Sequence, residues 1–344
     1  MVRSGTDDRA GSVPPARGRC RVCDGAVEFA LTAREMLLGR RDRFDYVECR
    51  DCGCLQIEEI PDDLDRYYPS DDYYVGTQRV RRRRAGGLLG LRRAWSRFRL
   101  RPGRLRRAIS GRRYAHFDWF RRTQTREDDA ILDVGCGSGR LLWRLHREGF
   151  RHLVGIDEFC QPVAAVDSVG PRFEKESLER HRGTYHLVMA HHSFEHARDP
   201  RVAFEALASL VGPGGRLLLR MPLADGWARR HYGADWVQLD APRHLHLHTR
   251  RSIARLAARA GFRVALVEDD SGPFQIWGSE LLRRDIALSE AQAGAKSPFG
   301  LFGRLAARAR ARRLSRKGLG DQACFYLERK GDLEREPIAR SGPT

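Results

Sequence analysis

The sequence predicts an α/β chain built on a doubly wound parallel sheet, with a small cysteine-bearing module in front of it. The apolar run 131–134 ends in Gly135-x-Gly137-x-Gly139, and a helix-forming apolar run follows it. A second apolar run, 152–156, ends in an acid, Asp157. A doubly wound sheet typically begins with a strand, a glycine turn and a helix, followed by a second strand that ends in an acid.

The glycine turn is the first element that needs a chemical reason. Glycine lets the backbone turn tightly and lets a ligand approach, because no Cβ stands in the way. The dinucleotide fingerprint is G-x-G-x-x-G; here the third glycine comes one residue early, and an acid, Asp133, lies inside the strand. Asp157 lies where a carboxylate can bond ribose hydroxyls. The alternative is a glycine-rich turn that holds no ligand.

The cysteines form two knuckles before the sheet. Cys20-x-x-Cys23 and Cys49-x-x-Cys52 have the spacing of a tetrathiolate zinc site. Four thiolates close the coordination sphere, so the predicted Zn²⁺ is structural. The alternative is four unrelated thiols, and Cys54 is expected to be a small buried residue.

Positive charge is concentrated in two segments of the 344-residue chain, whose net charge is +18. Residues 77–126 hold 18 arginines and one acid, and residues 281–317 hold ten basic residues and two acids. The remainder is net negative, which favours two local basic patches over a whole-domain nucleic-acid footprint. In the first segment, Leu88, Leu91, Trp95 and Phe98 recur at helical spacing. A basic amphipathic helix of this kind suits an anionic membrane surface, and the alternative is a linker helix packed on the core.

The ends and the hydropathy of the chain bear on its location. The chain shows no apolar run of transmembrane length and no apolar stretch typical of a secretory signal. We therefore expect a cytoplasmic protein, with the arginine segment allowing peripheral contact with the inner face of a membrane.

Three stretches together carry a resemblance to a known family. The D-x-G-x-G-x-G form at 133–139 resembles motif I of class I S-adenosylmethionine-dependent methyltransferases. The cysteine knuckles, taken with the tyrosine-rich stretch 66–74, resemble the N-terminal zinc module of a bacterial group that methylates sugars and other small or lipid-linked metabolites. The turn Gly212-Pro-Gly-Gly215 resembles the step into the fifth strand of that family.

The resemblance implies a Rossmann-like methyltransferase sheet of seven strands whose last pair is antiparallel. Strands are expected near 130–134, 152–157, 171–175, 185–190, 215–221, 262–268 and 322–329. The expected organisation is a disordered 1–18, a zinc module at 19–76, an arginine-rich helical linker at 77–126, the S-adenosylmethionine-dependent methyltransferase domain at 127–330 with a basic helical insertion at 281–317, and a tail at 331–344.

The same resemblance implies the cofactor site. The predicted residues follow the strands that the cofactor would cross: Asp133, Gly135, Gly137, Gly139, Asp157, Ser177, Leu178, His191 and His192. In the family the stretch corresponding to His192-x-x-Glu195-His196-x-x-Asp199-Pro lies beside the methionine end of S-adenosylmethionine. Some relatives bind a divalent metal through E-x-x-E-H, but here His192 replaces the first acid. The stretch also spells a zinc-protease pattern, which we treat as coincidence because it follows a strand.

The acceptor side is expected in the loop 236–248, where W-x-x-x-D-x-P-R-H resembles the substrate loop of the same group. His244 is the first candidate base, with His192 and Glu195 as further catalytic candidates, because a near-neutral imidazole suits proton removal. His196 is expected to be structural. A metal site on His244, His246 and His248, which alternate in sequence, is the runner-up, and a loop that only shapes the pocket is the third alternative.

The sequence therefore predicts a methyltransferase acting on a small-molecule, sugar or lipid-linked acceptor. One rival is an RNA methyltransferase that grips RNA with the zinc module and the arginine segment. The other is a non-catalytic scaffold with the cofactor fold, docked on a membrane assembly. Intact Asp133, Asp157 and the three glycines argue against the scaffold.

Overall fold

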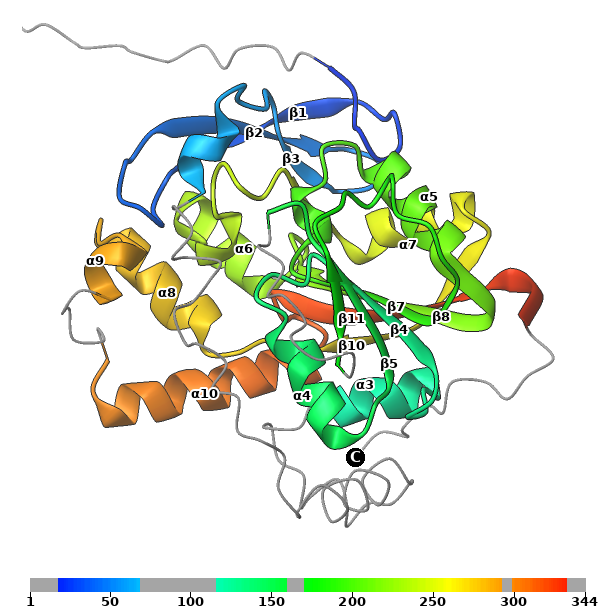
Figure 1. Ribbon diagram of the computed structural model, residues 1–344. Coiled ribbons are helices and arrows are strands. Elements are labelled where there is room, and N and C mark those ends of the chain that lie inside the picture. Colours follow the sequence, from blue (N-terminus) through cyan, green and yellow to red (C-terminus); the bar gives the residue numbers. More distant parts are fainter. Residues whose placement is uncertain (1–17, 69–115, 160–169, 293–298, 333–344) are drawn as a thin grey trace, which may run out of the picture.

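A computed structural model describes residues 18–68, 116–159, 170–292 and 299–332 (Figure 1). Most of the predicted arginine-rich linker, all but the last residue of the predicted N-terminal disordered stretch, and nearly all of the predicted tail lie outside these residues. No helix of the described part combines the length and the apolar composition needed to cross a bilayer.

The main sheet has seven strands in the order β10-β11-β8-β7-β4-β5-β6. All neighbours are parallel except β11, which is antiparallel to both β8 and β10. The strands are β4 (Ala130–Val134), β5 (His152–Ile156), β6 (Arg172–Glu174), β7 (Tyr185–His191), β8 (Val211–Pro222), β10 (Phe262–Asp269) and β11 (Gln322–Arg329). The seven predicted strands and the antiparallel last pair are thereby confirmed.

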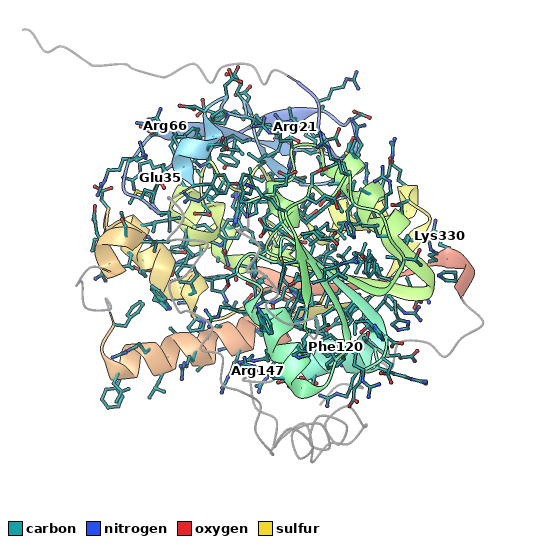
Figure 2. All side chains as sticks on the ribbon, viewed as in Figure 1. Arg21, Glu35, Arg66, Phe120, Arg147 and Lys330 are labelled. Atoms are coloured by element: carbon teal, nitrogen blue, oxygen red, sulfur yellow. The ribbon has the colours of Figure 1, made fainter. Side chains whose placement is uncertain are left out.

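Helices cover both faces of this sheet because the central strands are apolar on both sides. On one face, α3 (His116–Thr123) and α4 (Arg140–Glu148) pack over Ile131, and Phe120, labelled in Figure 2, is fully buried there. On the other face, α5 (Pro200–Leu210) and α7 (Arg250–Arg259) pack over Leu132.

The starts of these last two helices follow from local sequence. Asp199 caps α5 by accepting hydrogen bonds from the backbone N–H groups of Arg201 and Val202. Thr249 and Ser252 form a capping box at the start of α7. These capping bonds fix the residues at which α5 and α7 begin.

A second sheet of four strands lies above the first, in the order β1-β2-β3-β9 (Figure 1). Its first three strands come from the N-terminal module: β1 (Val27–Arg34), β2 (Arg43–Cys49) and β3 (Leu55–Ile57). The fourth, β9 (His246–Leu247), comes from the loop predicted to face the acceptor. The predicted boundary of the module at residue 76 therefore leaves out one strand of its sheet.

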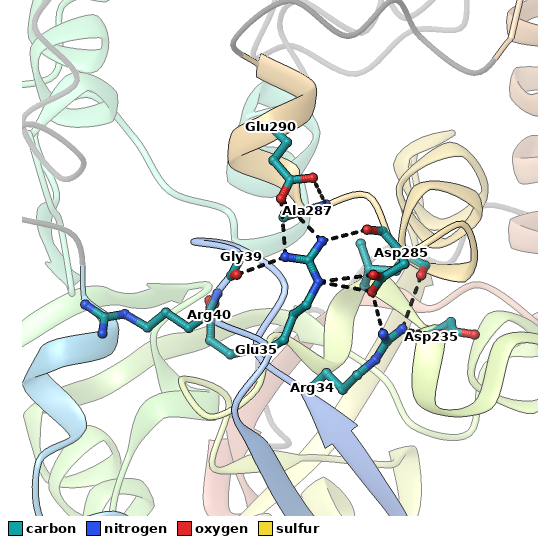
Figure 3. Close-up of polar contacts among 10 residues, drawn as sticks. Arg34, Glu35, Gly39, Arg40, Asp235, Asp285, Ala287 and Glu290 are labelled. Atoms are coloured by element: carbon teal, nitrogen blue, oxygen red, sulfur yellow. Dashed lines mark hydrogen bonds and ion pairs between the residues drawn. The ribbon is translucent and has the colours of Figure 1, made fainter.

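The remaining helices flank the two sheets. They are α6 (Trp227–Tyr232), α8 (Phe274–Arg283), α9 (Leu288–Gln292) and α10 (Leu301–Arg316). The predicted helical insertion at 281–317 thus begins earlier, within α8. Figure 3 shows that Arg34 of the N-terminal hairpin meets Asp285 of this segment. Arg41 of the hairpin also pairs with Asp285 and with Glu290.

Candidate functional site

The glycine turn between β4 and α4 requires glycine for two separate reasons. Gly135 and Gly139 have φ values of +71° and +67°, the left-handed region that glycine tolerates best. A Cβ on Gly135 would lie 2.4 Å from the Cβ of Ser193, and one on Gly139 would lie 2.3 Å from the ring of Phe173. The turn is therefore packed closely against the β7 loop and β6.

Asp157, at the end of β5, holds this turn in place. Its Oδ2 accepts a hydrogen bond from the Gly137 N–H at 2.9 Å, and its Oδ1 accepts one from the Phe159 N–H at 2.8 Å. The carboxylate is thus oriented by backbone donors on both oxygens, which fixes the direction in which it can accept further bonds from a ligand.

A cavity of about 580 Å³ opens beside the turn, at the carboxyl ends of β4, β5 and β7. Ligands bind at such strand ends in open α/β sheets. The lining comes from these strand ends, from the loop after β6, from α5, from the loop before β9 and from the N-terminal module: Leu64, Asp65, Tyr68, Val134, Gly135, Ile156, Asp157, Glu158, Phe159, Glu176, Leu178, Glu179, Ala190, His192, Ser193, Phe194, His196, Ala197, Arg198, Ala203, Leu207, Asp240 and Arg243.

The predicted cofactor residues fall into two groups around this cavity. Gly135, Asp157, Leu178 and His192 line it. The others lie in the same strand ends and loops but are not part of the lining: Asp133, Gly137, Gly139, Ser177 and His191. The second group therefore lies outside the cavity lining.

Asp133 and His191 show why. Asp133 is 3% exposed, and its Oδ1 has no hydrogen-bond partner among the described residues. Burial, and then the nearby charge of Asp157, raise the pKa of Asp133 to about 7. His191 lies against Trp119, with ring centroids 4.5 Å apart, and burial lowers its pKa well below the usual value.

Glu195 is the buried charge behind the cavity. It is 0% exposed, and His192 Nδ1 lies 3.4 Å from its Oε1. Burial alone would raise the pKa of Glu195, but the His192 ring and the neighbouring His244 outweigh it and lower the pKa to about 2. Glu195 is therefore an anion surrounded by imidazoles.

Arg220 fixes His192 through one ring nitrogen. Its Nε2 lies 2.7 Å from Nη1 of Arg220, which can only donate, so the imidazole accepts there. Its Nδ1 then carries the proton and faces Glu195. This leaves His192 no lone pair for a substrate, although its ring lines the cavity.

His196 and His244 are neighbours with different access to the cavity. Their ring centroids are 4.8 Å apart, and only His196 belongs to the lining. His196 Nδ1 lies 2.8 Å from the Arg243 carbonyl, so this nitrogen carries the proton and donates. Burial, followed by the charge on His244, lowers the pKa of His196.

His244 is 6% exposed, and unlike the neighbouring His196 it is not part of the cavity lining. Its Nδ1 lies 2.8 Å from the Gln238 carbonyl, and its Nε2 lies 3.9 Å from Glu195 and 3.7 Å from Asp240. The sequence places His244 in the acceptor loop, as expected, but its side chain is directed to these carboxylates.

The three alternating histidines do not converge on one point. His246 Nδ1 lies 3.1 Å from the Ala197 carbonyl, and His248 Nδ1 lies 3.2 Å from Ser252 Oγ. His244 instead groups with Glu195 and His196, whose ligand atoms lie within 4.8 Å of one another. The three-histidine metal site considered from the sequence is therefore not assembled by the described residues.

Arg243 joins the acceptor loop to the N-terminal module. It is 2% exposed, and its guanidinium bonds to Asp240 on its own loop, to Glu35 at 3.2 Å and to the carbonyl of Tyr67 at 2.7 Å. Glu35, labelled in Figure 2, is 0% exposed and also accepts three backbone N–H bonds from Leu37, Leu38 and Arg40. Burial opposes the charge on Asp240, but Arg243 lowers the pKa of Asp240 to about 2.

The four knuckle cysteines meet at one point. Cys20 Sγ and Cys52 Sγ lie 3.6 Å apart, Cys23 Sγ and Cys49 Sγ lie 3.5 Å apart, and all four sulfurs lie within 4.8 Å of one another. A tetrahedral Zn²⁺ with bonds of about 2.3 Å places its sulfurs about 3.8 Å apart, so the set fits the ion. Arg21, labelled in Figure 2, ties the first knuckle to β3 and its following residue through the carbonyls of Ile57 and Glu58.

Comparison with known proteins bears on this arrangement. Residues 105–267 match the family model described as "Methyltransferase domain". The match begins in the predicted linker and ends in β10, so the region that is similar to a methyltransferase domain includes the glycine turn, most of the cavity and the acceptor loop.

Curated relatives cover part of the same region. The "Ubiquinone biosynthesis O-methyltransferase" of Cronobacter sakazakii is 33% identical over 128 residues, which is 34% of this chain and 52% of that protein. The protein of the same name from Aeromonas salmonicida is 31% identical over 160 residues, 41% of this chain and 65% of that protein. The chain thus spans between half and two thirds of the length of these relatives. A solved S-adenosylmethionine-dependent methyltransferase from Mesorhizobium loti is 18% identical, covers 62% of this chain and 98% of its own, and has a TM-score of 0.42.

Several cavity residues were not singled out from the sequence. Tyr68, Ser193 and Arg243 lie within stretches that carry the resemblance, but the sequence assigns no role to them. Asp65 and Phe159 lie in no such stretch. Tyr68 and Phe159 stack with ring centroids 5.8 Å apart, one from the N-terminal module and one from the methyltransferase domain. The acceptor-side wall is therefore shared between segments that are far apart in sequence.

Proposed function

We propose that the chain is an S-adenosylmethionine-dependent methyltransferase that acts on a small-molecule acceptor. The observation that carries the proposal is the cavity at the ends of β4, β5 and β7, which the glycine turn and Asp157 border on one side and His196, Asp240 and Tyr68 on the other. Its volume lies in the range of small-molecule sites.

The residues on the first side fit the cofactor. Gly135 brings the backbone to the edge of the cavity without a side chain, and Asp157 presents a carboxylate fixed by backbone donors. We propose that Asp157 accepts the ribose hydroxyls and that Gly135, Leu178 and His192 border the rest of the cofactor. When bound, S-adenosylmethionine supplies an electrophilic methyl on a sulfonium. The chain's own residues then orient the acceptor and take its proton.

We propose His196 as the base, in place of His244. The Nδ1 proton of His196 is held by the Arg243 carbonyl, and its Nε2 has no hydrogen-bond partner among the described residues and belongs to a side chain that lines the cavity. As the acceptor loses its proton to Nε2, the imidazolium forms near anionic Glu195 and Asp240, which stabilise it. Glu195 and His244 act through His196, and Tyr68, whose hydroxyl lies 3.4 Å from His196 Nδ1, helps to orient it.

The charge of the lining favours a small polar acceptor over RNA. Its acids are Asp65, Asp157, Glu158, Glu176, Glu179 and Asp240, against two arginines. Carboxylates accept bonds from the hydroxyls of a sugar-like or phenolic acceptor but repel a phosphate backbone.

We propose that Cys20, Cys23, Cys49 and Cys52 hold one structural Zn²⁺. The support is the tetrahedral spacing of the sulfurs. We also retain the prediction that residues 77–126, most of which lie outside the described residues, contact an anionic membrane surface.

Two experiments test the function. Calorimetry should show S-adenosylmethionine binding, weakened about 10- to 150-fold in Asp157→Asn because a charged acceptor is lost. Glu179→Gln, a charge-matched change elsewhere in the lining, should bind nearly as the unaltered protein. No binding to the unaltered protein would refute the proposal.

The second experiment compares His196→Ala with His244→Ala. We expect His196→Ala to retain cofactor binding and to lose turnover by about 10²- to 10⁴-fold. His244→Ala should lose less, because its ring is not part of the lining. Full turnover in His196→Ala would return His244 to the first place.

A further inference from the structure

Helix α10 leaves large apolar side chains in solvent. Leu301, Phe302 and Leu305 are 65%, 86% and 52% exposed, and with Phe159 and Val202 they are the exposed large apolar residues of the described chain. All three lie in the first turns of α10, which runs along the lower edge of the molecule in Figure 1. We call Leu301, Phe302 and Leu305 the apolar end of α10.

The side of α10 opposite the apolar end packs against the rest of the protein. Ala307 and Ala311 are buried and pack with Ile276 of α8 and with Trp227, and Leu314 is also buried. At 3.6 residues per turn, Leu305 lies on the face opposite these residues. The apolar end therefore faces away from the core, on a helix that the core fixes in place.

Arg308, Arg312 and Arg316 continue the outward side of α10. Arg310 lies toward the buried side instead, with its guanidinium 4.2 Å from the centroid of the Trp227 ring. The helix contains six arginines, Arg304, Arg308, Arg310, Arg312, Arg313 and Arg316, and no acid. All six are exposed, and none of them has an ion pair with a carboxylate of the described residues. By contrast, Arg34 pairs with Asp285 (Figure 3), and Arg41 pairs with both Asp285 and Glu290.

We propose that α10 docks on an anionic lipid bilayer, with its apolar end in the interface and its arginines on lipid phosphates. On the outward side of this fixed helix, the apolar end is followed by Arg308, Arg312 and Arg316, which matches such a surface in both hydropathy and charge. Residues 77–126 are a poor alternative cover, because their 18 arginines would repel α10. RNA would engage the arginines but would leave Leu301 and Leu305 in water.

The test is sedimentation of the full chain with vesicles of phosphatidylcholine, with or without about a third phosphatidylglycerol. We expect binding only to the anionic vesicles, and loss of binding in high salt. The triple variant Leu301→Ser, Phe302→Ser, Leu305→Ser should bind at least about tenfold more weakly. The double variant Arg308→Gln, Arg312→Gln should bind about 25-fold more weakly, at about fivefold per arginine.

A matched control removes the same charge elsewhere. Arg251→Gln, Arg255→Gln on exposed positions of α7 should reduce binding by less than about threefold. Hydrogen exchange with vesicles present should slow in residues 301–316. The proposal would be overturned if the triple variant bound vesicles as well as the unaltered chain, or if the control bound as weakly as the α10 arginine variant. It would also be overturned if the unaltered chain formed a dimer without vesicles and the triple variant were a monomer. Cofactor affinity should be unchanged in all these variants, which separates this test from that of the proposed function.

Discussion

Asp133→Asn isolates the contribution of one buried carboxyl to stability. In the folded chain the pKa of Asp133 is raised to about 7 by burial and by Asp157, whereas an unfolded aspartate titrates near 4. Because the folded state holds this proton more tightly, the contribution of Asp133 is fully present below about pH 4. It is lost as the pH rises through about 7.

The magnitude follows from the slope of 1.36 kcal/mol per pH unit for one proton. From roughly pH 5.5 to pH 7 the folded state keeps the proton and the unfolded state does not, so the free energy of unfolding falls by about 2 kcal/mol; the fall levels off above pH 7. Asparagine has nearly the same shape and does not titrate. The stability of Asp133→Asn should therefore fall by about 2 kcal/mol less than that of the unaltered protein between pH 5.5 and pH 8.

Urea unfolding of the ligand-free protein at both pH values measures this difference. Asp321, whose pKa burial raises to about 6, adds its own slope to both proteins and cancels in the comparison. Equal slopes for the two proteins would show that Asp133 is already ionised in the folded state, and that its environment is more polar than the structure indicates.

Three further predictions concern the cysteine module, the Arg243–Glu35 ion pair and the glycine turn. Purified protein should contain one zinc per chain by elemental analysis, and Cys49→Ser should lose it and melt at lower temperature; a metal-free unaltered protein would contradict this. Arg243→Met should cost about 3–5 kcal/mol in urea unfolding, because Glu35 and its buried charge lose their cationic partner, and Met fills similar volume; a neutral effect would mean that the pair only balances its desolvation. Gly139→Ala should weaken cofactor binding in calorimetry and lower the melting temperature, since its Cβ would overlap the Phe173 ring; unchanged affinity would show that the turn adapts.

The elements that local sequence specifies were predictable. The strands of the main sheet are short apolar runs bounded by glycine or acids, so periodicity and turn residues suffice to find them. The cysteine cluster was predictable because thiolate spacing within each knuckle is a local property.

The arrangement of the acceptor side was not predictable, because it depends on contacts between distant segments. Whether His196 or His244 reaches the cavity depends on which carbonyl holds each Nδ1, and those carbonyls belong to Arg243 and Gln238 in the folded loop. Tyr68 lines the cavity next to Tyr67, whose carbonyl accepts a hydrogen bond from Arg243. No local sequence pattern predicts these contacts between distant segments.

The strand that β9 adds to the N-terminal sheet has a consequence for how the chain is made. Leu55 pairs with Leu247, so the ribosome must release almost two hundred further residues before β3 finds its partner. Until then β3 is an open edge whose unpaired N–H and C=O groups can recruit another nascent chain. The proposed zinc ligands Cys20, Cys23, Cys49 and Cys52 all emerge early, but the sheet closes only when β9 has emerged. Expression of the first 68 residues alone should therefore give a product that aggregates, and co-expression of the remainder should rescue it.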